Sequence, residues 1–260
     1  MAPLGELSAP PVFEVISGLV FQPLPELSPL VLGSYWERKR QAFPHHQLHP
    51  ALADEPTVVL EALPPLRVWL VSADDEFVLQ IQSDRFYLNW RARGQAYPRF
   101  GDHGTSRGIR SRFEEEYRQF AEFCEQALGR RPAPVRLELA KVDHLVEGKH
   151  WSGLADLALV VPWVATFAGF SQAADTSLAL RFRERRETGA LAVGMDLVRL
   201  AGDEDRRVLK LETRTGRPIP PGACLPTILG EANAELNEVF GRLISPEGIS
   251  RFGQKEQAHR

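Results

Sequence analysis

"LRVWLVSADDEFVLQIQSDRFYLNWR", residues 66–91, contains three short runs in which apolar and polar side chains alternate. Alternation with a period of two is typical of β-strands, because successive side chains of a strand point to opposite faces. The runs are separated at Ala73–Asp75 and Ser83–Asp84, where Ser and Asp favour tight turns. The stretch therefore predicts three antiparallel strands in succession.

The chain on either side of this meander predicts a further strand and two helices. A strand is expected at 11–24, a short helix at 28–43 and a loop at 44–56, where proline residues recur. Residues 107–129 carry apolar side chains at helical spacing and end at Gly129, a residue type that commonly terminates helices.

The second half, after a connector at 130–134, again has strands followed by a helix. Strands are expected at 135–146, 177–184, 190–201 and 207–216, and an amphipathic helix at 220–245. We therefore predict an α+β fold, with antiparallel sheets on which long amphipathic helices pack. Two domains are expected, residues 1–131 and 132–260. Their shared order allows two similar halves, although no residue-level repeat is visible.

The composition is that of an ordinary globular protein, with 260 residues, 43% hydrophobic and 25% charged. A net charge of -3 argues against a polyanion binder that acts through overall charge. Two cysteines are too few for a disulfide framework or a zinc cluster. The start shows no secretory pattern, and the longest apolar run, 154–170, contains Asp156 and Pro162. We expect a cytoplasmic protein without a membrane span or a cofactor.

The hairpin at residues 77–91 has one apolar and one polar face. Its apolar side chains are Phe77, Leu79, Ile81, Phe86, Leu88 and Trp90. The opposite face carries amide, phenol and guanidinium groups, which makes it the best candidate for a binding surface. The candidate residues, including two from the following loop, are Gln80, Gln82, Tyr87, Asn89, Arg91, Arg93 and Arg99.

Arginines are concentrated between residues 85 and 112, where Tyr87, Tyr97 and Phe100 lie among them. Guanidinium groups bind phosphates and aromatic rings stack on bases, so one alternative is a nucleic-acid or nucleotide binder. The other alternative is that the acidic residues 114–116, which follow directly, neutralise the arginines while the aromatic side chains are core.

Three segments carry a resemblance to a known family. "PPVFEVISGLVFQPL" (10–24), "LQIQSDRFYLNWR" (79–91) and "FGRLISPEGISRFG" (240–253) together resemble a sporadically distributed, uncharacterised bacterial family. The matching positions are Pro11, Glu14, Gln82, Phe86, Leu88, Asn89, Trp90, Arg91, Tyr97 and Pro98. The resemblance implies a cytoplasmic bacterial protein of patchy occurrence, as is common among accessory and conflict-related genes. It implies no activity and no catalytic residue.

Few residues suggest chemistry. His45, His46 and His49 lie in the predicted loop between two prolines and match no metal-binding motif, so no metal site is expected. His144 follows Asp143 on a predicted strand, which places the two side chains on opposite faces. The chain also lacks the glycine-rich phosphate loops and the nucleophile motif of common hydrolases.

Within the closing segment 220–245 the helix is expected to start near Pro226, so Cys224 lies just before a helix N-terminus, which lowers a thiol pKa. An enzyme that uses His144 or Cys224 therefore stays an alternative. The favoured interpretation is a non-enzymatic cytoplasmic protein that binds a protein partner in an accessory or conflict-related bacterial system. A homodimer is also expected, because the segment 154–170 is more apolar than its position requires.

Overall fold

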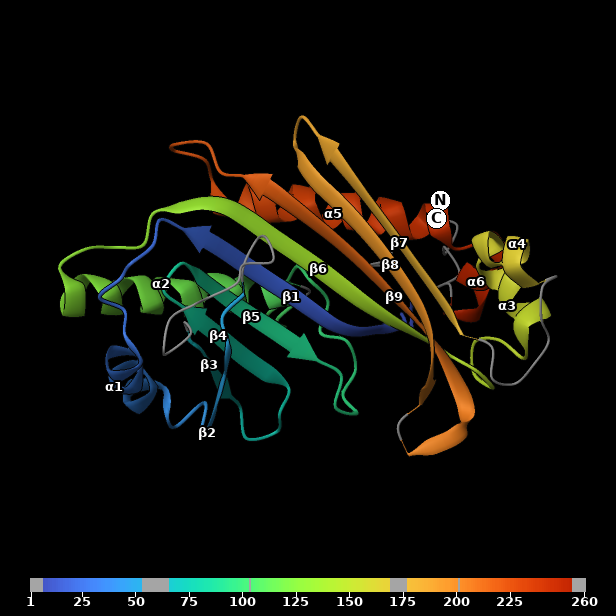
Figure 1. Cartoon of the computed structure of the whole chain (residues 1–260), viewed down its shortest axis with the longest axis horizontal. Helices are drawn as coiled ribbons and strands as arrows, with labels where there is room; N and C mark the ends of the chain where they lie inside the picture. Colours follow the sequence, from blue (N-terminus) through green and yellow to red (C-terminus); the bar gives the residue numbers. More distant parts are fainter. Residues whose placement is uncertain (1–6, 53–65, 103, 169–176, 201, 254–260) are drawn as a thin grey trace, which may run out of the picture. The chain divides into compact units, whose positions relative to one another are not determined.

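The computed structural model describes residues 7–52, 66–102, 104–168, 177–200 and 202–253. Its nine strands form one antiparallel sheet in the order β2-β3-β4-β5-β1-β6-β9-β8-β7, together with helices (Figure 1). This confirms the α+β class and the antiparallel pairing. The prediction of more than one sheet is wrong, because β1 (Val12–Phe21) and β6 (Pro134–Val146) stand between the two predicted sets of strands in one continuous strand order.

The chain divides into two compact units. The N-terminal unit comprises residues 15–138 and 217–229, and the C-terminal unit comprises residues 1–14, 139–216 and 230–260. The predicted domain boundary after residue 131 falls just before β6. The division into domains 1–131 and 132–260 stays a prediction.

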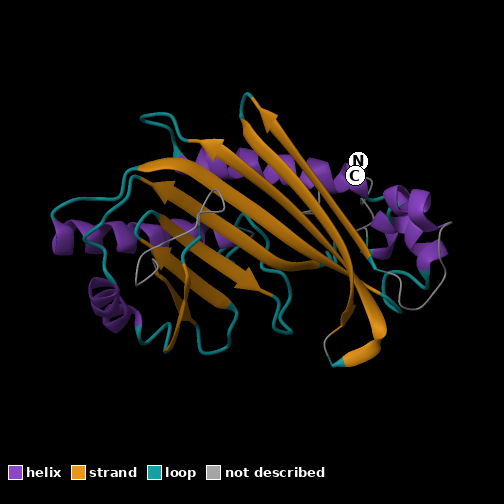
Figure 2. Cartoon of the chain, viewed as in Figure 1, coloured by secondary structure: helices purple, strands orange, loops and turns teal. Residues whose placement is uncertain are grey.

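The N-terminal unit contains the predicted meander. Its strands are β2 (His45–Pro50), β3 (Leu66–Val71), β4 (Phe77–Gln82) and β5 (Arg85–Arg91), each antiparallel to the next. Its helices are α1 (Pro29–Lys39) and α2 (Ile109–Leu128). Helix α2 contacts β5 and α1 contacts β3 (Figure 2). The helix ends as expected at Gly129, which adopts a left-handed φ of 73°.

Strand β2 corrects the loop expected at 44–56. Its six residues pair with β3 from His45↔Val71 to Pro50↔Leu66. All six side chains are exposed or half-buried, so no apolar alternation marks this strand in the sequence.

The C-terminal unit contains the second meander and most of the closing helix. Its strands are β7 (Leu178–Arg186), β8 (Gly189–Leu200) and β9 (Asp203–Pro218). Its helices are α3 (Leu154–Val160), the 3-10 turn η2 (Pro162–Val164), α4 (Ala165–Ala168), α5 (Leu225–Leu243) and α6 (Pro246–Arg251). Buried side chains from both strands and helices form one apolar core, including Met195, Leu209, Leu211, Phe240 and Phe252. None of the helices within the described ranges is long and apolar enough to cross a bilayer.

Candidate functional site

The polar face of the β4–β5 hairpin is buried. Gln80 and Asn89 are 6% and 2% exposed. The Gln80 side-chain amide donates to Asn89 Oδ1 at 2.8 Å, and Arg67 donates to Gln80 Oε1 at 2.8 Å. The Gln82 side-chain oxygen accepts from the Leu52 backbone N–H, and the Gln82 side-chain nitrogen donates to the Leu52 backbone C=O. These amides are therefore used within the N-terminal unit, because a buried amide needs partners of its own.

Tyr87 lies directly over Gly18 of β1. A Cβ atom at Gly18 would lie 2.0 Å from Tyr87 Cδ1, so only glycine fits there. The Tyr87 hydroxyl donates to Glu138 at 2.7 Å. Burial and the nearby Glu138 carboxylate raise the pKa of the Tyr87 phenol well above its usual range. This phenol is a structural donor rather than an acid.

Arg91, at the end of the hairpin, and Arg93, just after it, both form ion pairs with one carboxylate in a turn. Arg91 and Arg93 contact the two oxygens of Asp75 at 3.2 and 2.6 Å, and Arg91 also stacks on Trp69 at 5.0 Å. Arg99 has a positive φ of 68° and its carbonyl accepts from the Ile109 N–H. The seven predicted binding residues thus lie in one part of the N-terminal unit, with the amides and Tyr87 buried and the arginines closer to the surface. Their role in binding stays a prediction.

Two further arginines of this region have acidic partners. Arg110 pairs with Glu114 and Arg112 pairs with Glu116, at 3.8 and 3.3 Å. These pairs match the neutralising alternative that the acidic residues 114–116 suggested. They leave less unbalanced positive charge for a phosphate backbone.

The candidate chemical groups belong to different units of the chain. His144 stacks on Phe13 at 3.8 Å, and burial with nearby Lys210 lowers its pKa to about 4. Cys224 is exposed, and a hydrogen bond from Thr227 lowers its thiol pKa. Among the residues that the structure describes, no three His, Cys, Asp or Glu side chains could hold one metal ion.

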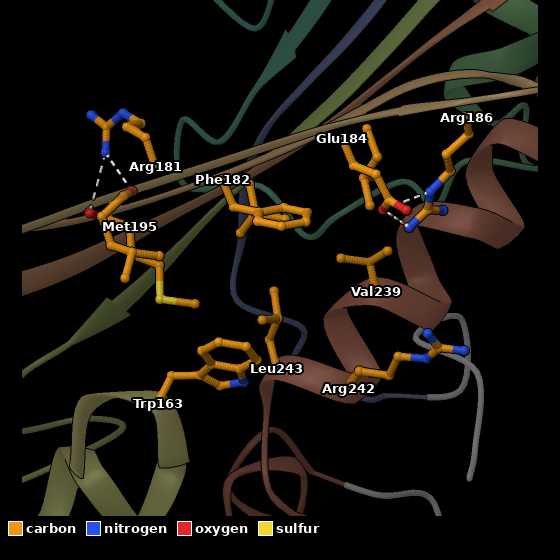
Figure 3. Close-up of a pocket in the computed structure, with 12 residues that line it drawn as sticks. Trp163, Arg181, Phe182, Glu184, Arg186, Met195, Val239, Arg242 and Leu243 are labelled. Atoms are coloured by element: carbon orange, nitrogen blue, oxygen red, sulfur yellow. Dashed lines mark hydrogen bonds and ion pairs between the residues drawn. The ribbon is translucent and has the colours of Figure 1, made fainter. Parts of the chain in front are cut away.

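A groove in the C-terminal unit was not predicted. It has a volume of about 400 Å³ and lies between the β7–β8 hairpin and the end of α5 (Figure 3). The strands contribute Leu180, Phe182, Leu191, Val193 and Met195. The helical side contributes Trp163, Val239 and Leu243. The charged lining residues are Arg181, Glu184, Arg186 and Arg242.

Large apolar side chains are exposed at this groove. Trp163 is 59% exposed and Phe182 is 50% exposed. Figure 3 shows Trp163, Leu243 and Met195 gathered around Phe182. Exposed aromatic side chains beside an apolar hollow are characteristic of an interaction site.

The opposite face of the same hairpin is basic. A second hollow of about 380 Å³ is lined by Arg181, Arg183, Ala192, Gly194, Glu212 and Arg214, among others. Arg181 makes a bidentate pair with Asp196 at 2.7 and 2.8 Å. Arg183 and Arg185 are exposed and have no ion-pair partner among the described residues.

Sequence reasoning predicted the strand at 177–184 but not its function. The available signal was "LRFRER" (180–185), in which arginine alternates with apolar or acidic residues and which contains no lysine or proline. Comparison with known protein families finds no matching family for this chain. Comparison with curated proteins likewise finds no match.

Proposed function

We propose that this chain is a non-enzymatic binding protein for another protein, and that the groove of the C-terminal unit holds part of that partner. The supporting observation is the apolar groove with exposed Trp163 and Phe182 on its lining. Protein interfaces are enriched in aromatic residues, methionine and arginine, and all three line this groove. Energetic anchors of such interfaces are most often tryptophan, tyrosine or arginine.

The proposal moves the binding surface from the predicted hairpin to the groove. The hairpin amides already have partners inside the N-terminal unit, whereas Trp163 and Phe182 present apolar area to solvent. The resemblance to a patchily distributed bacterial family supports an accessory role in the cytoplasm.

Self-association is a separate part of the proposal. Leu159 and Trp163 of the segment 154–170 are 55% and 59% exposed, which supports the expected homodimer. Residues 169 and 170 of that segment lie outside the described residues. Sedimentation of the purified chain at micromolar concentration tests the homodimer. A chain that sediments only as a monomer would contradict it.

The partner proposal is tested in two steps with matched variants. The wild-type chain and a Trp163→Ser, Phe182→Ser variant are used to capture proteins from an extract of the native cells. The control variant, Leu30→Ser with Leu48→Ser, also removes two exposed apolar side chains, but from the N-terminal unit. Each captured protein is then purified and titrated against all three chains by calorimetry.

The expected result is a purified protein that binds the wild-type and control chains alike and the groove variant at least about tenfold more weakly. A captured protein that binds the groove variant as tightly as the wild type would contradict the proposal. Retention of no protein by the wild-type chain would also contradict it.

A further inference from the structure

Strand β7 is a terminal strand of the sheet. In the part of the sheet that the structure describes, its one strand neighbour is β8, which it pairs from Leu178↔Leu197 to Arg186↔Gly189. In an antiparallel pair, alternate residues direct their backbone N–H and C=O groups away from the partner strand. A row of these groups along β7 is therefore directed outward, which is the template for adding another strand.

The two faces of β7 have different chemistry. Leu180 and Phe182 face the apolar groove. Arg183 and Arg185 alternate with them and lie on the opposite face, whereas Arg181 borders both hollows. A strand added beside β7 would continue both faces, since its side chains alternate in the same way.

The basic face carries positive charge that is only partly balanced by acidic side chains among the described residues. Asp196 neutralises Arg181 through two hydrogen bonds. Arg183 and Arg185 have no such partner within the described ranges and are exposed. They stand two residues apart, roughly 6.6 Å along the strand. Two acidic side chains at alternate positions of an added strand would match this spacing.

We propose that the partner adds an extended segment to β7, with alternating apolar and acidic side chains. The apolar side chains enter the groove beside Phe182, and the acidic side chains pair with Arg183 and Arg185. This inference rests on the proposed function, because it specifies what occupies the same groove. Backbone pairing supplies affinity and the alternate side chains supply specificity.

Charge distinguishes this occupant from a second copy of the chain. Residues 178–186 contain four arginines and a single glutamate. Antiparallel pairing of two β7 strands would place arginines opposite arginines, and like charges directly opposite are destabilising. The other terminal strand, β2, begins after Pro44 and ends at Pro50, and proline is a common means of blocking a sheet edge.

Labelled synthetic peptides test the inference by fluorescence anisotropy with the full chain. The probe is a nine-residue peptide that alternates valine and glutamate. One control has the same composition in two blocks, which removes the alternation. Two others carry backbone N-methyl groups at the odd or at the even positions. A fourth replaces every glutamate with lysine.

The expected result is binding of the alternating peptide at least about tenfold tighter than the block peptide. One of the two N-methylated peptides should lose binding, because only one set of N–H groups can face β7. An Arg183→Glu, Arg185→Glu variant should reverse the preference towards the lysine peptide. Both arginines are exposed, so this variant is expected to fold, and circular dichroism checks that it does.

Equal binding of both N-methylated peptides and the unmodified peptide would overturn strand addition. An unchanged preference in the Arg183→Glu, Arg185→Glu variant would overturn the acidic class of partner, as would a failure of the alternating peptide to bind. These results leave the proposed function to its own test, because a partner can depend on Trp163 and Phe182 without adding a strand.

Discussion

At the scale of single residues, Gly18 shows how closely the N-terminal unit is packed. The Tyr87 ring occupies the space that a side chain at position 18 would need. The ring is held there, because its hydroxyl bonds to Glu138 and its side chain is 4% exposed. The sequence shows a glycine inside a strand, but the ring that requires it is distant in the chain.

We predict that Gly18→Ala destabilises the protein by about 1–3 kcal/mol, the usual cost of overpacking. Equilibrium unfolding in urea measures the change. Gly33→Ala is the matched control, since Gly33 lies in α1 and has no atom within 4 Å of the new Cβ. The control should be neutral or gain up to about 1 kcal/mol. Equal effects of the two substitutions would contradict the packing argument.

A second residue-scale feature is the buried carboxyl of Asp143. It is 1% exposed, and its Oδ1 has no hydrogen-bond partner within the described parts of the chain. Lys141, on the same face of β6, donates to Asn237 at 2.6 Å. Burial raises the pKa of Asp143 from 3.8 to about 7, against the opposing effect of Lys141.

The raised pKa gives a pH dependence with a defined sign. The folded state keeps the Asp143 proton up to about pH 7, whereas the unfolded chain releases it near 3.8. The associated stability is therefore complete below about pH 4 and is lost as the pH rises to about 7. We predict that Asp143→Asn removes this loss. The difference in unfolding free energy, wild type minus variant, should decrease as the pH rises from about 4.5 to 7. This window lies roughly between the pKa values of Asp143 in the unfolded and folded states.

Asp156→Asn is the control for that measurement. Arg251 holds the pKa of Asp156 below its usual range, so its contribution is already present throughout this window. A pH-independent difference between wild type and Asp143→Asn would show that the carboxyl does not carry a raised pKa.

At the scale of elements, a buried ion pair ties α1 to α2. Lys39 Nζ lies 2.5 Å from Glu116 Oε2, with side chains 10% and 5% exposed. Lys39→Met removes one of the two cations beside the buried Glu116 carboxylate and leaves Arg112, at 3.3 Å, as the other. We predict that Lys39→Met costs about 3 kcal/mol of unfolding free energy in urea titrations.

Arg40→Met, at the C-cap of the same helix, is the control, because the Arg40–Glu37 pair is exposed. It should cost less than about 1 kcal/mol. A double variant, Lys39→Met with Glu116→Leu, should recover most of the loss. A loss for Lys39→Met no larger than that of the control would contradict the role of the pair.

Most elements could be predicted from local patterns. The strands at 66–91 and the helix at 107–129 follow from alternation, helical spacing and a terminal glycine, and both are confirmed. Strand β2 could not be predicted, because its pairing with β3 uses backbone groups and its side chains stay exposed. The burial of Gln80 and Asn89 could not be predicted either. An amide side chain on a strand gives the same sequence pattern whether it faces water or another amide.

At the scale of the whole molecule, the candidate groove combines segments that are distant in sequence. Trp163, Phe182 and Leu243 come from a 3-10 turn, a strand and a helix. Trp163 and Phe182 stand in no recognisable motif, and only the folded C-terminal unit brings the three side chains together. The arginines of β7 could be read from the sequence, but the sequence could not show that Arg183 and Arg185 have no ion-pair partner among the described residues.

Hydrogen–deuterium exchange of the wild-type chain, with and without the alternating valine–glutamate peptide, shows whether the peptide pairs with β7. We predict slower exchange of the β7 backbone, residues 178–186, when the peptide is bound, because added strand pairing protects outward N–H groups. Exchange at residues 85–112 should not change. Protection at 85–112 with no change at β7 would contradict the account and return the binding surface to the hairpin.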